Sequence, residues 1–324
     1  MSDVFNIIES NPLQAILVGN DVELSYQVFG RPIATAPVVV VNHALTGNSN
    51  VSGKNGWWKS LIGEKEVIDT EKFTVICFNI PGNGFDGKVE NSIDNYKEYS
   101  TTVIAALFWE GLEKIGVNQL FAVIGGSLGG GIAWEMGFLK PKAIQFIIPI
   151  ATNYKATDWL IGNVLVQDQI LNNSIRPIHD ARLHAMLLYR TPHSLQTKFL
   201  AEEKEGLFQV ESWLLHHGNK LEERFLLSSY KLMNHLLKTI GQSITENDLL
   251  AFAVETKAVI HQIAINSDYF FIPEENRKTH QKLKMLNDKI QYSEIDSIHG
   301  HDAFLIEYEQ LNTILKPIFT IQTN

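Results

Sequence analysis

The most constraining feature of the chain is a glycine-rich pentapeptide that lies between two patterned segments. Residues 125–129 read Gly-Gly-Ser-Leu-Gly and directly follow the apolar run 120–124, and a helical pattern occupies 130–138. A G-x-S-x-G sequence between a buried strand and a helix is typical of a sharp turn that lifts the serine hydroxyl toward the helix N-terminus. The context therefore indicates that Ser127 is a nucleophile, whereas the pentapeptide alone would indicate only a turn.

Strand-like and helical segments alternate on both sides of this turn. The predicted strands are 22–29, 37–41, 73–80, 120–124, 143–150, 258–265 and 290–295, and the predicted helices that flank them are 101–115, 130–138, 274–286 and 304–315. Apolar strand runs without polar alternation, separated by helices, are typical of a mostly parallel sheet covered on both faces. We therefore predict an α/β fold.

The pattern changes in the middle of the chain. Between about 157 and 250 no β-branched strand is evident, and helical segments rich in Leu, Glu, Lys and His are predicted at 180–189, 195–205 and 221–240. We interpret residues 153–252 as a helical cap inserted into an α/β core formed by 1–152 and 253–324. A chain of 324 residues is long enough for one large domain with such an insertion.

Composition excludes several classes of partner. The net charge is −9 and no lysine- or arginine-rich run is present, which disfavours binding to nucleic acid or to an anionic membrane. No apolar run is long enough to cross a bilayer, and residues 1–13 lack the pattern of a signal peptide. The single cysteine, Cys77, lies in a predicted strand and suits a packed core thiol in a reducing compartment. We expect a cytoplasmic protein.

A serine nucleophile needs a base, and the base needs a carboxylate that orients it. In α/β hydrolases the chain order is Ser, then Asp or Glu, then His, each after a strand. Asp268 follows the predicted strand 258–265, and both His299 and His301 follow 290–295. Asp268 is the predicted acid, and spacing alone leaves the two histidines as alternative bases.

An oxyanion hole needs two backbone N–H donors, one from the residue after the nucleophile and one from the loop after an early strand. The first is Leu128. The second is Leu45, in the loop 42–47 after the predicted strand 37–41. His43 in that loop is a possible third catalytic group, but a side chain that supports the loop by hydrogen bonds is the favoured interpretation.

Two further patterns resemble ligand sites. Residues 82–87 match G-x-G-x-x-G, but the polar stretch 88–95 follows where a dinucleotide fingerprint would open a helix, so a surface loop is predicted. The cluster of His299, His301 and Asp302 has no second histidine–carboxylate group at ligand spacing, so no metal site is predicted. The pair His216-His217 is expected to be a partly solvated helix feature.

The motifs taken together resemble the homoserine O-acetyltransferase family. The resemblance is carried by the segments 43–47 (His-Ala-Leu-Thr-Gly), 56–58 (Gly-Trp-Trp), 75–77 before Asn79, 125–130 and 300–305 (Gly-His-Asp-Ala-Phe-Leu), and it extends from about 39 to 305. It implies an α/β-hydrolase fold, His301 as the base and Asp268 as the acid. In the cap, Arg182 and Tyr189 match the family's substrate-facing arginine and tyrosine, and Asp302 follows the base. The resemblance therefore implies that Arg182, Tyr189 and Asp302 bind substrate.

The resemblance implies transfer of an acetyl group from acetyl-CoA to the hydroxyl of L-homoserine through an acyl-serine, in methionine biosynthesis. It also implies a homodimer and no permanently bound cofactor. The loop 81–87 and the segment 152–180 differ from the family pattern, so a serine esterase with the same triad, or transfer to another hydroxyl such as that of serine, is the alternative. A binding protein without turnover is a further alternative that the complete triad disfavours.

Overall fold

The computed structural model describes residues 11–19 and 21–320, and its centre is an eight-stranded sheet. In spatial order the strands are β1 (Gln14–Val18), β2 (Val22–Gly30), β6 (Thr74–Phe78), β3 (Val38–Asn42), β7 (Leu120–Gly126), β8 (Ile144–Ile150), β11 (Val259–Ile265) and β12 (Ile290–Ile295). The six strands from β6 to β12 are parallel, and β1 and β2 pair antiparallel at one edge. The predicted α/β fold with a mostly parallel sheet is confirmed.

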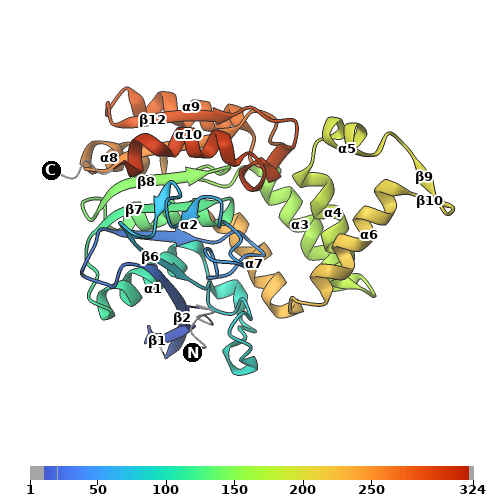
Figure 1. The fold of residues 1–324 in the computed structure, drawn as a ribbon, viewed down its shortest axis with the longest axis horizontal. Helices are drawn as coiled ribbons and strands as arrows, with labels where there is room; N and C mark the ends of the chain where they lie inside the picture. Colours follow the sequence, from blue (N-terminus) through green and yellow to red (C-terminus); the bar gives the residue numbers. More distant parts are fainter. Residues whose placement is uncertain (1–10, 20, 321–324) are drawn as a thin grey trace, which may run out of the picture.

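Ten α-helices in the described ranges surround or extend from the sheet (Figure 1). They are α1 (Thr101–Lys114), α2 (Leu128–Leu139), α3 (Asp158–Asn173), α4 (Pro177–Tyr189), α5 (Pro192–Phe199), α6 (Gln209–Glu222), α7 (Leu227–Thr239), α8 (Glu246–Glu255), α9 (Pro273–Lys284) and α10 (Tyr308–Phe319). Short 3-10 turns lie at η1 (Val89–Asn91), η2 (Tyr96–Glu98) and η3 (Gly300–Leu305), and two-residue strands form the pairs β4 (Ile62–Gly63) with β5 (Ile68–Asp69) and β9 (Glu203–Lys204) with β10 (Leu207–Phe208).

Both faces of the sheet are buried, which explains the continuous apolar strand runs. All five residues of β3 are buried, and successive side chains of a strand point to opposite faces. Val38 and Val40 pack in a cluster with α1, α2 and α8, whereas Val39 and Val41 pack in a second cluster with Trp58 and α10. Because the side chains of β3 are buried on both faces of the sheet, its sequence does not alternate between apolar and polar residues.

Helices α3 to α8 lie between β8 and β11 in the sequence, and α3 to α6 project from one end of the core (Figure 1). The chain leaves and re-enters the core through adjacent segments, because the Ala156 N–H donates to the Ile240 carbonyl at 2.9 Å. Helix α8 packs beside α9, and the predicted boundary at 252/253 falls inside α8. The division into core and cap at these residues remains a prediction.

Several predicted helix ends are wrong, each for a local reason. Helix α5 ends at Phe199 rather than extending to 205, because Leu200 and Ala201 take left-handed φ values of 53° and 56° and the β9–β10 pair follows. The predicted helix 221–240 is broken at residues 223–226, where Leu226 is extended (φ −83°, ψ 146°). The predicted last helix 304–315 is instead the 3-10 turn η3 followed by α10.

Candidate active site

Ser127 lies on the turn between β7 and α2 in a strained backbone conformation. Its φ of 56° and ψ of −123° are rare for a residue with a side chain. The turn is held because the Ser127 N–H donates to the Ile150 carbonyl at 2.8 Å, and the Ser127 carbonyl accepts from the Gly130 and Gly131 N–H groups. This geometry matches the predicted sharp turn and points the hydroxyl away from the sheet.

The close approach of α2 to the sheet requires glycine. A Cβ placed on Gly129 would lie 2.2 Å from the Asn42 carbonyl oxygen, well inside van der Waals contact. The absence of that atom allows the first turn of α2 to pack directly on the end of β3. The loop that follows β3 is thereby brought beside Ser127.

The structure brings Ser127, His301 and Asp268 together in one hydrogen-bonded chain. The Ser127 Oγ lies 2.8 Å from His301 Nε2, and His301 Nδ1 lies 2.7 Å from Asp268 Oδ2. The second carboxylate oxygen of Asp268 accepts from the Phe270 and Phe271 N–H groups at 2.7 and 2.9 Å. The partners therefore assign the Nδ1–H tautomer to His301, which leaves Nε2 free to accept the serine proton.

All three side chains are removed from water, since Ser127, Asp268 and His301 are 5%, 1% and 3% exposed. The imidazole of His301 lies among four aromatic rings, with centroid distances of 5.1 to 5.7 Å to Tyr189, Phe270, Phe271 and Phe304. This packing leaves the ring one orientation, so that both nitrogens face their partners.

His299, the alternative base, is directed elsewhere. Its Nδ1 accepts from Arg190 Nη2 at 3.0 Å and faces Ser194 Oγ at 2.9 Å. Burial and Arg190 lower the pKa of His299, consistent with a neutral acceptor. His299 thus joins the β12–η3 loop to the start of α5, and of the two histidines only His301 reaches Ser127.

The two amides predicted for the oxyanion hole are those of Leu45, in the loop after β3, and Leu128, the first residue of α2. In the described part of the chain, neither the Leu45 N–H nor the Leu128 N–H has a hydrogen-bond partner, and both residues are buried. His43 holds this loop, because its Nε2 accepts from the Ile80 N–H at 3.0 Å and its Nδ1 lies 2.8 Å from the Ala44 carbonyl. Burial lowers the pKa of His43 to about 4, so its ring is neutral. These contacts agree with the favoured interpretation that His43 supports the loop.

Comparisons with known proteins identify the family of the chain. The family model of the alpha/beta hydrolase fold matches residues 37–305. A homoserine O-acetyltransferase of Cyclobacterium marinum is 32% identical over 321 residues, covering 92% of this chain and 89% of the relative. The chain belongs to the homoserine O-acetyltransferase family.

Two solved structures show that this family shares its fold with hydrolases. Homoserine O-acetyltransferase from Bacillus anthracis superposes with a TM-score of 0.79 at 18% identity, covering 93% of both chains. An esterase superposes with a TM-score of 0.83 at 14% identity, covering 95% of this chain and 99% of that chain. The fold alone therefore does not separate a transferase from an esterase.

The residues predicted to bind the substrate lie near the base. The guanidinium of Arg182 lies 5.8 Å from the centre of the Tyr189 ring, and the Tyr189 ring lies 5.4 Å from that of His301. Within residues 11–19 and 21–320, Arg182 forms no ion pair or hydrogen bond. Burial raises the pKa of the adjacent Asp302, and the nearby Arg182 opposes this shift. The structure thus places a free cation and a carboxylate beside the triad.

Two cap residues near the site were not predicted to take part. Tyr230 on α7 is 1% exposed, and burial raises its pKa to about 12, with Arg182 opposing. Arg224, in the break between α6 and α7, donates from Nη1 to the Thr46 carbonyl of the oxyanion loop at 3.2 Å. Only the contact between cap and core identifies them as residues near the site.

The remaining predicted features behave as follows. Cys77 is fully buried, and burial raises the pKa of its thiol. Residues 82–87 form a loop that is followed by the three-residue 3-10 turn η1 and not by an α-helix, as predicted, and Gly84 lies against Leu226 and Ser229 of the cap. His216 is exposed and His217 half-buried on α6. In the described ranges no helix is long and apolar enough to span a membrane, and no group of three or more potential ligands could hold a metal.

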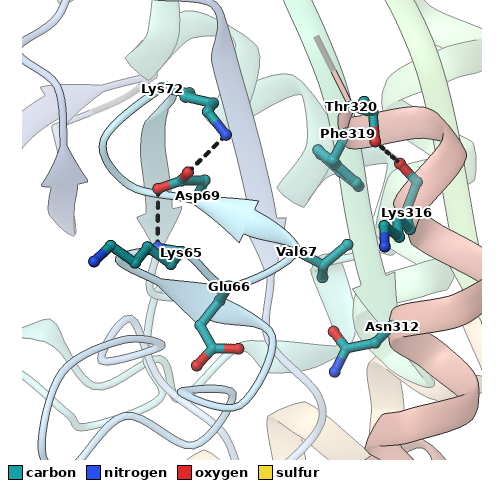
Figure 2. A pocket seen from close by; sticks show the side chains of 9 residues that line it. All are labelled: Lys65, Glu66, Val67, Asp69, Lys72, Asn312, Lys316, Phe319 and Thr320. Carbon is teal, nitrogen blue, oxygen red and sulfur yellow. Dashed lines mark hydrogen bonds and ion pairs between the residues drawn. The ribbon is translucent and has the colours of Figure 1, made fainter.

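A separate hollow of about 350 Å³ lies beside the C-terminal end of α10, at the opposite end of that helix from His301. Figure 2 shows Lys65, Lys72 and Lys316 around it, with Lys72 paired to Asp69. None of the residues that line this hollow belongs to the site around Ser127.

Proposed function

We propose that the protein transfers an acetyl group from acetyl-CoA to the hydroxyl of L-homoserine through an acetyl-Ser127 intermediate. The observation that carries the proposal is the continuous chain from Ser127 Oγ to His301 Nε2 at 2.8 Å and from His301 Nδ1 to Asp268 at 2.7 Å. A serine held in this way is activated by a general base whose tautomer is set by the carboxylate.

In the first half-reaction, Ser127 Oγ attacks the thioester carbonyl carbon and its proton passes to His301 Nε2. The free N–H groups of Leu45 and Leu128 are the donors for the tetrahedral oxyanion. The C–S bond then breaks, and His301 returns the proton to the departing sulfur, so that CoA leaves as a thiol.

In the second half-reaction, the homoserine hydroxyl gives its proton to His301 and attacks the acetyl-serine carbonyl. The bond to Ser127 Oγ breaks, and the proton on His301 returns to Ser127. The cap residue Tyr189 packs its ring 5.4 Å from that of His301, and the three triad side chains are at most 5% exposed. This packing restricts the access of water to the acyl-enzyme.

The charges next to His301 favour an amino-acid acceptor over water. Arg182 lacks a carboxylate partner in the described chain, and a guanidinium binds a carboxylate in a bidentate manner. Asp302, whose pKa burial raises, gains by pairing with an ammonium group. Both groups of homoserine, the carboxylate and the ammonium, therefore have a partner of opposite charge. A simple esterase has no need of either.

A homodimer and a cytoplasmic location remain predictions that rest on the family resemblance and on composition. Transfer to serine or another hydroxyl is a second possible outcome for the acceptor, since Arg182 and Asp302 recognise the groups common to amino acids.

The test follows thiol release from acetyl-CoA with and without L-homoserine, together with O-acetylhomoserine formation. Release that depends on homoserine supports the transferase, and equal release without it identifies a hydrolase. Arg182→Gln should raise the KM for homoserine at least about tenfold, the loss expected for a charge-assisted contact. Arg176→Gln is the matched control, because Arg176 pairs with Glu222 at the surface of the cap. No turnover of thioesters or simple esters by the wild-type protein would refute an enzymatic role.

A further inference from the structure

The cap carries two positive side chains that share one aromatic ring. Arg190, just after α4, has its Cζ 6.0 Å from the centre of the Trp213 ring on α6. Lys198 on α5 has its Nζ 5.1 Å from the same ring. We call Arg190, Lys198 and Trp213 the cap cation cluster. Figure 1 shows α4, α5 and α6 together on the side where the cap projects.

Neither cation of the cluster forms an ion pair with a carboxylate in the described residues. Within residues 11–19 and 21–320, most ion pairs join surface lysines or arginines to carboxylates, but none includes Arg190 or Lys198. The cluster therefore brings two positive charges together on one face of the cap, an arrangement that attracts anions.

The local electrostatics agree with an excess of positive charge. Burial, followed by the charge of Arg190, lowers the pKa of Lys198. The pKa of His217, whose ring lies 4.5 Å from Trp213, is lowered to about 4 by burial and by the surrounding cations. Arg182, Lys198 and Lys220 are among these cations.

The cap cation cluster is connected to the catalytic triad. Arg190 Nη2 donates to Ser194 Oγ at 2.6 Å and to His299 Nδ1 at 3.0 Å, two neutral acceptors that fix the guanidinium without cancelling its charge. The residue before it, Tyr189, places its ring against His301. Arg190 is therefore the next residue in sequence after Tyr189, which packs on the catalytic base.

We propose that the cap cation cluster binds the phosphate groups of the acetyl donor. This inference rests on the proposed function, in which the donor is acetyl-CoA. That donor carries its thioester at one end of a long flexible arm and a diphosphate and a 3′-phosphate at the other. Arg182 serves the single carboxylate of the acceptor, so the cations farther along the cap are available for the phosphates, which favour fixed guanidinium and ammonium groups.

The test compares two lysine reversals in the same cap. Lys198→Glu changes the cluster, and Lys204→Glu makes the same charge change at an exposed position on β9. Each variant is measured with acetyl-CoA and with S-acetyl-N-acetylcysteamine, a thioester that lacks the nucleotide. Lys198→Arg, which keeps the charge, is the conservative variant.

For Lys198→Glu we expect the KM for acetyl-CoA to rise about tenfold or more, since a charge-assisted contact is replaced by repulsion. The KM for homoserine and the turnover of the small thioester should stay within about twofold, and Lys204→Glu should behave as wild type in every assay. Lys198→Arg should retain the wild-type KM. Added salt should raise the wild-type KM for acetyl-CoA but not for the small thioester.

Three results would overturn the proposal while leaving the acetyltransferase intact. They are an equal effect of the two reversals, an equal loss with the small thioester, and a change of oligomeric state in Lys198→Glu, which would assign the cluster to a second copy of the chain. If the wild-type protein turns over simple esters but not acetyl-CoA, the proposed function and this site both fail.

Discussion

At the residue scale, the two carboxylate oxygens of Asp268 have different partners and different roles. Its Oδ1 is held by the Phe270 and Phe271 amides, and its Oδ2 is left for His301. The carboxylate is therefore anchored to the backbone of its own loop, independently of the histidine. A change at Oδ2 should alter the tautomer of His301 without moving the loop.

Asp268→Asn tests this separation. The amide can keep the acceptor toward the backbone but presents an N–H₂ group to His301 Nδ1, which favours the unproductive tautomer. We expect kcat to fall by about 10³- to 10⁴-fold with little change in thermal stability. Asp296→Asn is the control, an exposed acid that accepts from Asn266 near the same strand ends. A loss below tenfold in Asp268→Asn would contradict the role of the carboxylate.

Glu135 on α2 is a buried carboxylate outside the site. It is 1% exposed and accepts from the Gly241 N–H and from the hydroxyls of Thr101 and Thr102. Burial raises its pKa, although these donors oppose the shift. The folded state therefore binds the Glu135 proton more tightly than the unfolded state does.

The sign of the resulting pH dependence follows from linkage. The stabilising effect of the protonated carboxyl is fully present below the unfolded pKa and is lost as pH rises through the raised folded pKa. Relative to Glu135→Gln, the wild-type protein should lose stability over that window, with a slope of at most about 1.4 kcal/mol per pH unit. Urea unfolding of both proteins from pH 4 to pH 8 measures it, and parallel curves would show that the carboxyl does not titrate with folding.

At the element scale, the sequence predicted the bounds of an element well where the pattern that defines it is local. The strands β3, β7 and β11 were predicted within one or two residues, because each is buried on both faces. The ends of α5 and α6 were not, since they depend on left-handed Leu200 and on the cap packing at Phe225. His301 could be assigned as the base in place of His299 only from the family motif. Tyr230 could be identified as a residue near the site only from the fold.

The packing of α2 on β3 can be tested with a single methyl group. Gly129→Ala would place its Cβ against the Asn42 carbonyl, so α2 must shift and the Leu128 amide with it. We expect a loss of about 1–3 kcal/mol in stability and at least tenfold in kcat. Gly162→Ala on α3 is the control, because a Cβ there meets nothing within 4 Å. It should stabilise the protein by about 0.5–1 kcal/mol and leave kcat unchanged. Equal behaviour of the two variants would rule out this account of the turn.

At the scale of the whole molecule, cap and core share one hydrophobic cluster. Leu232 and Leu236 of α7 belong to the same cluster as Ile132 and Trp134 of α2. A continuous cluster gives no boundary at which one part could melt first. We therefore expect the cap and the core to unfold together.

Leu236→Ala examines that cooperativity. Removing a fully buried leucine from α7 should cost about 2–5 kcal/mol and should lower a single transition seen alike by circular dichroism and tryptophan fluorescence. Leu165→Ala, at an exposed position on α3, should have little effect. Two separate transitions in the variant would show instead that the cap is an independent folding unit.

The hydrogen bond between Ala156 and Ile240 has a consequence for how such proteins diversify. Because the intervening excursion starts and finishes at neighbouring points, its length and content can change without opening the sheet or moving Ser127. Selection can therefore act separately on the triad, which forms the acetyl-Ser127 intermediate, and on the cap surface that selects the acceptor. A transplant of residues 157–239 between relatives should carry acceptor preference with it.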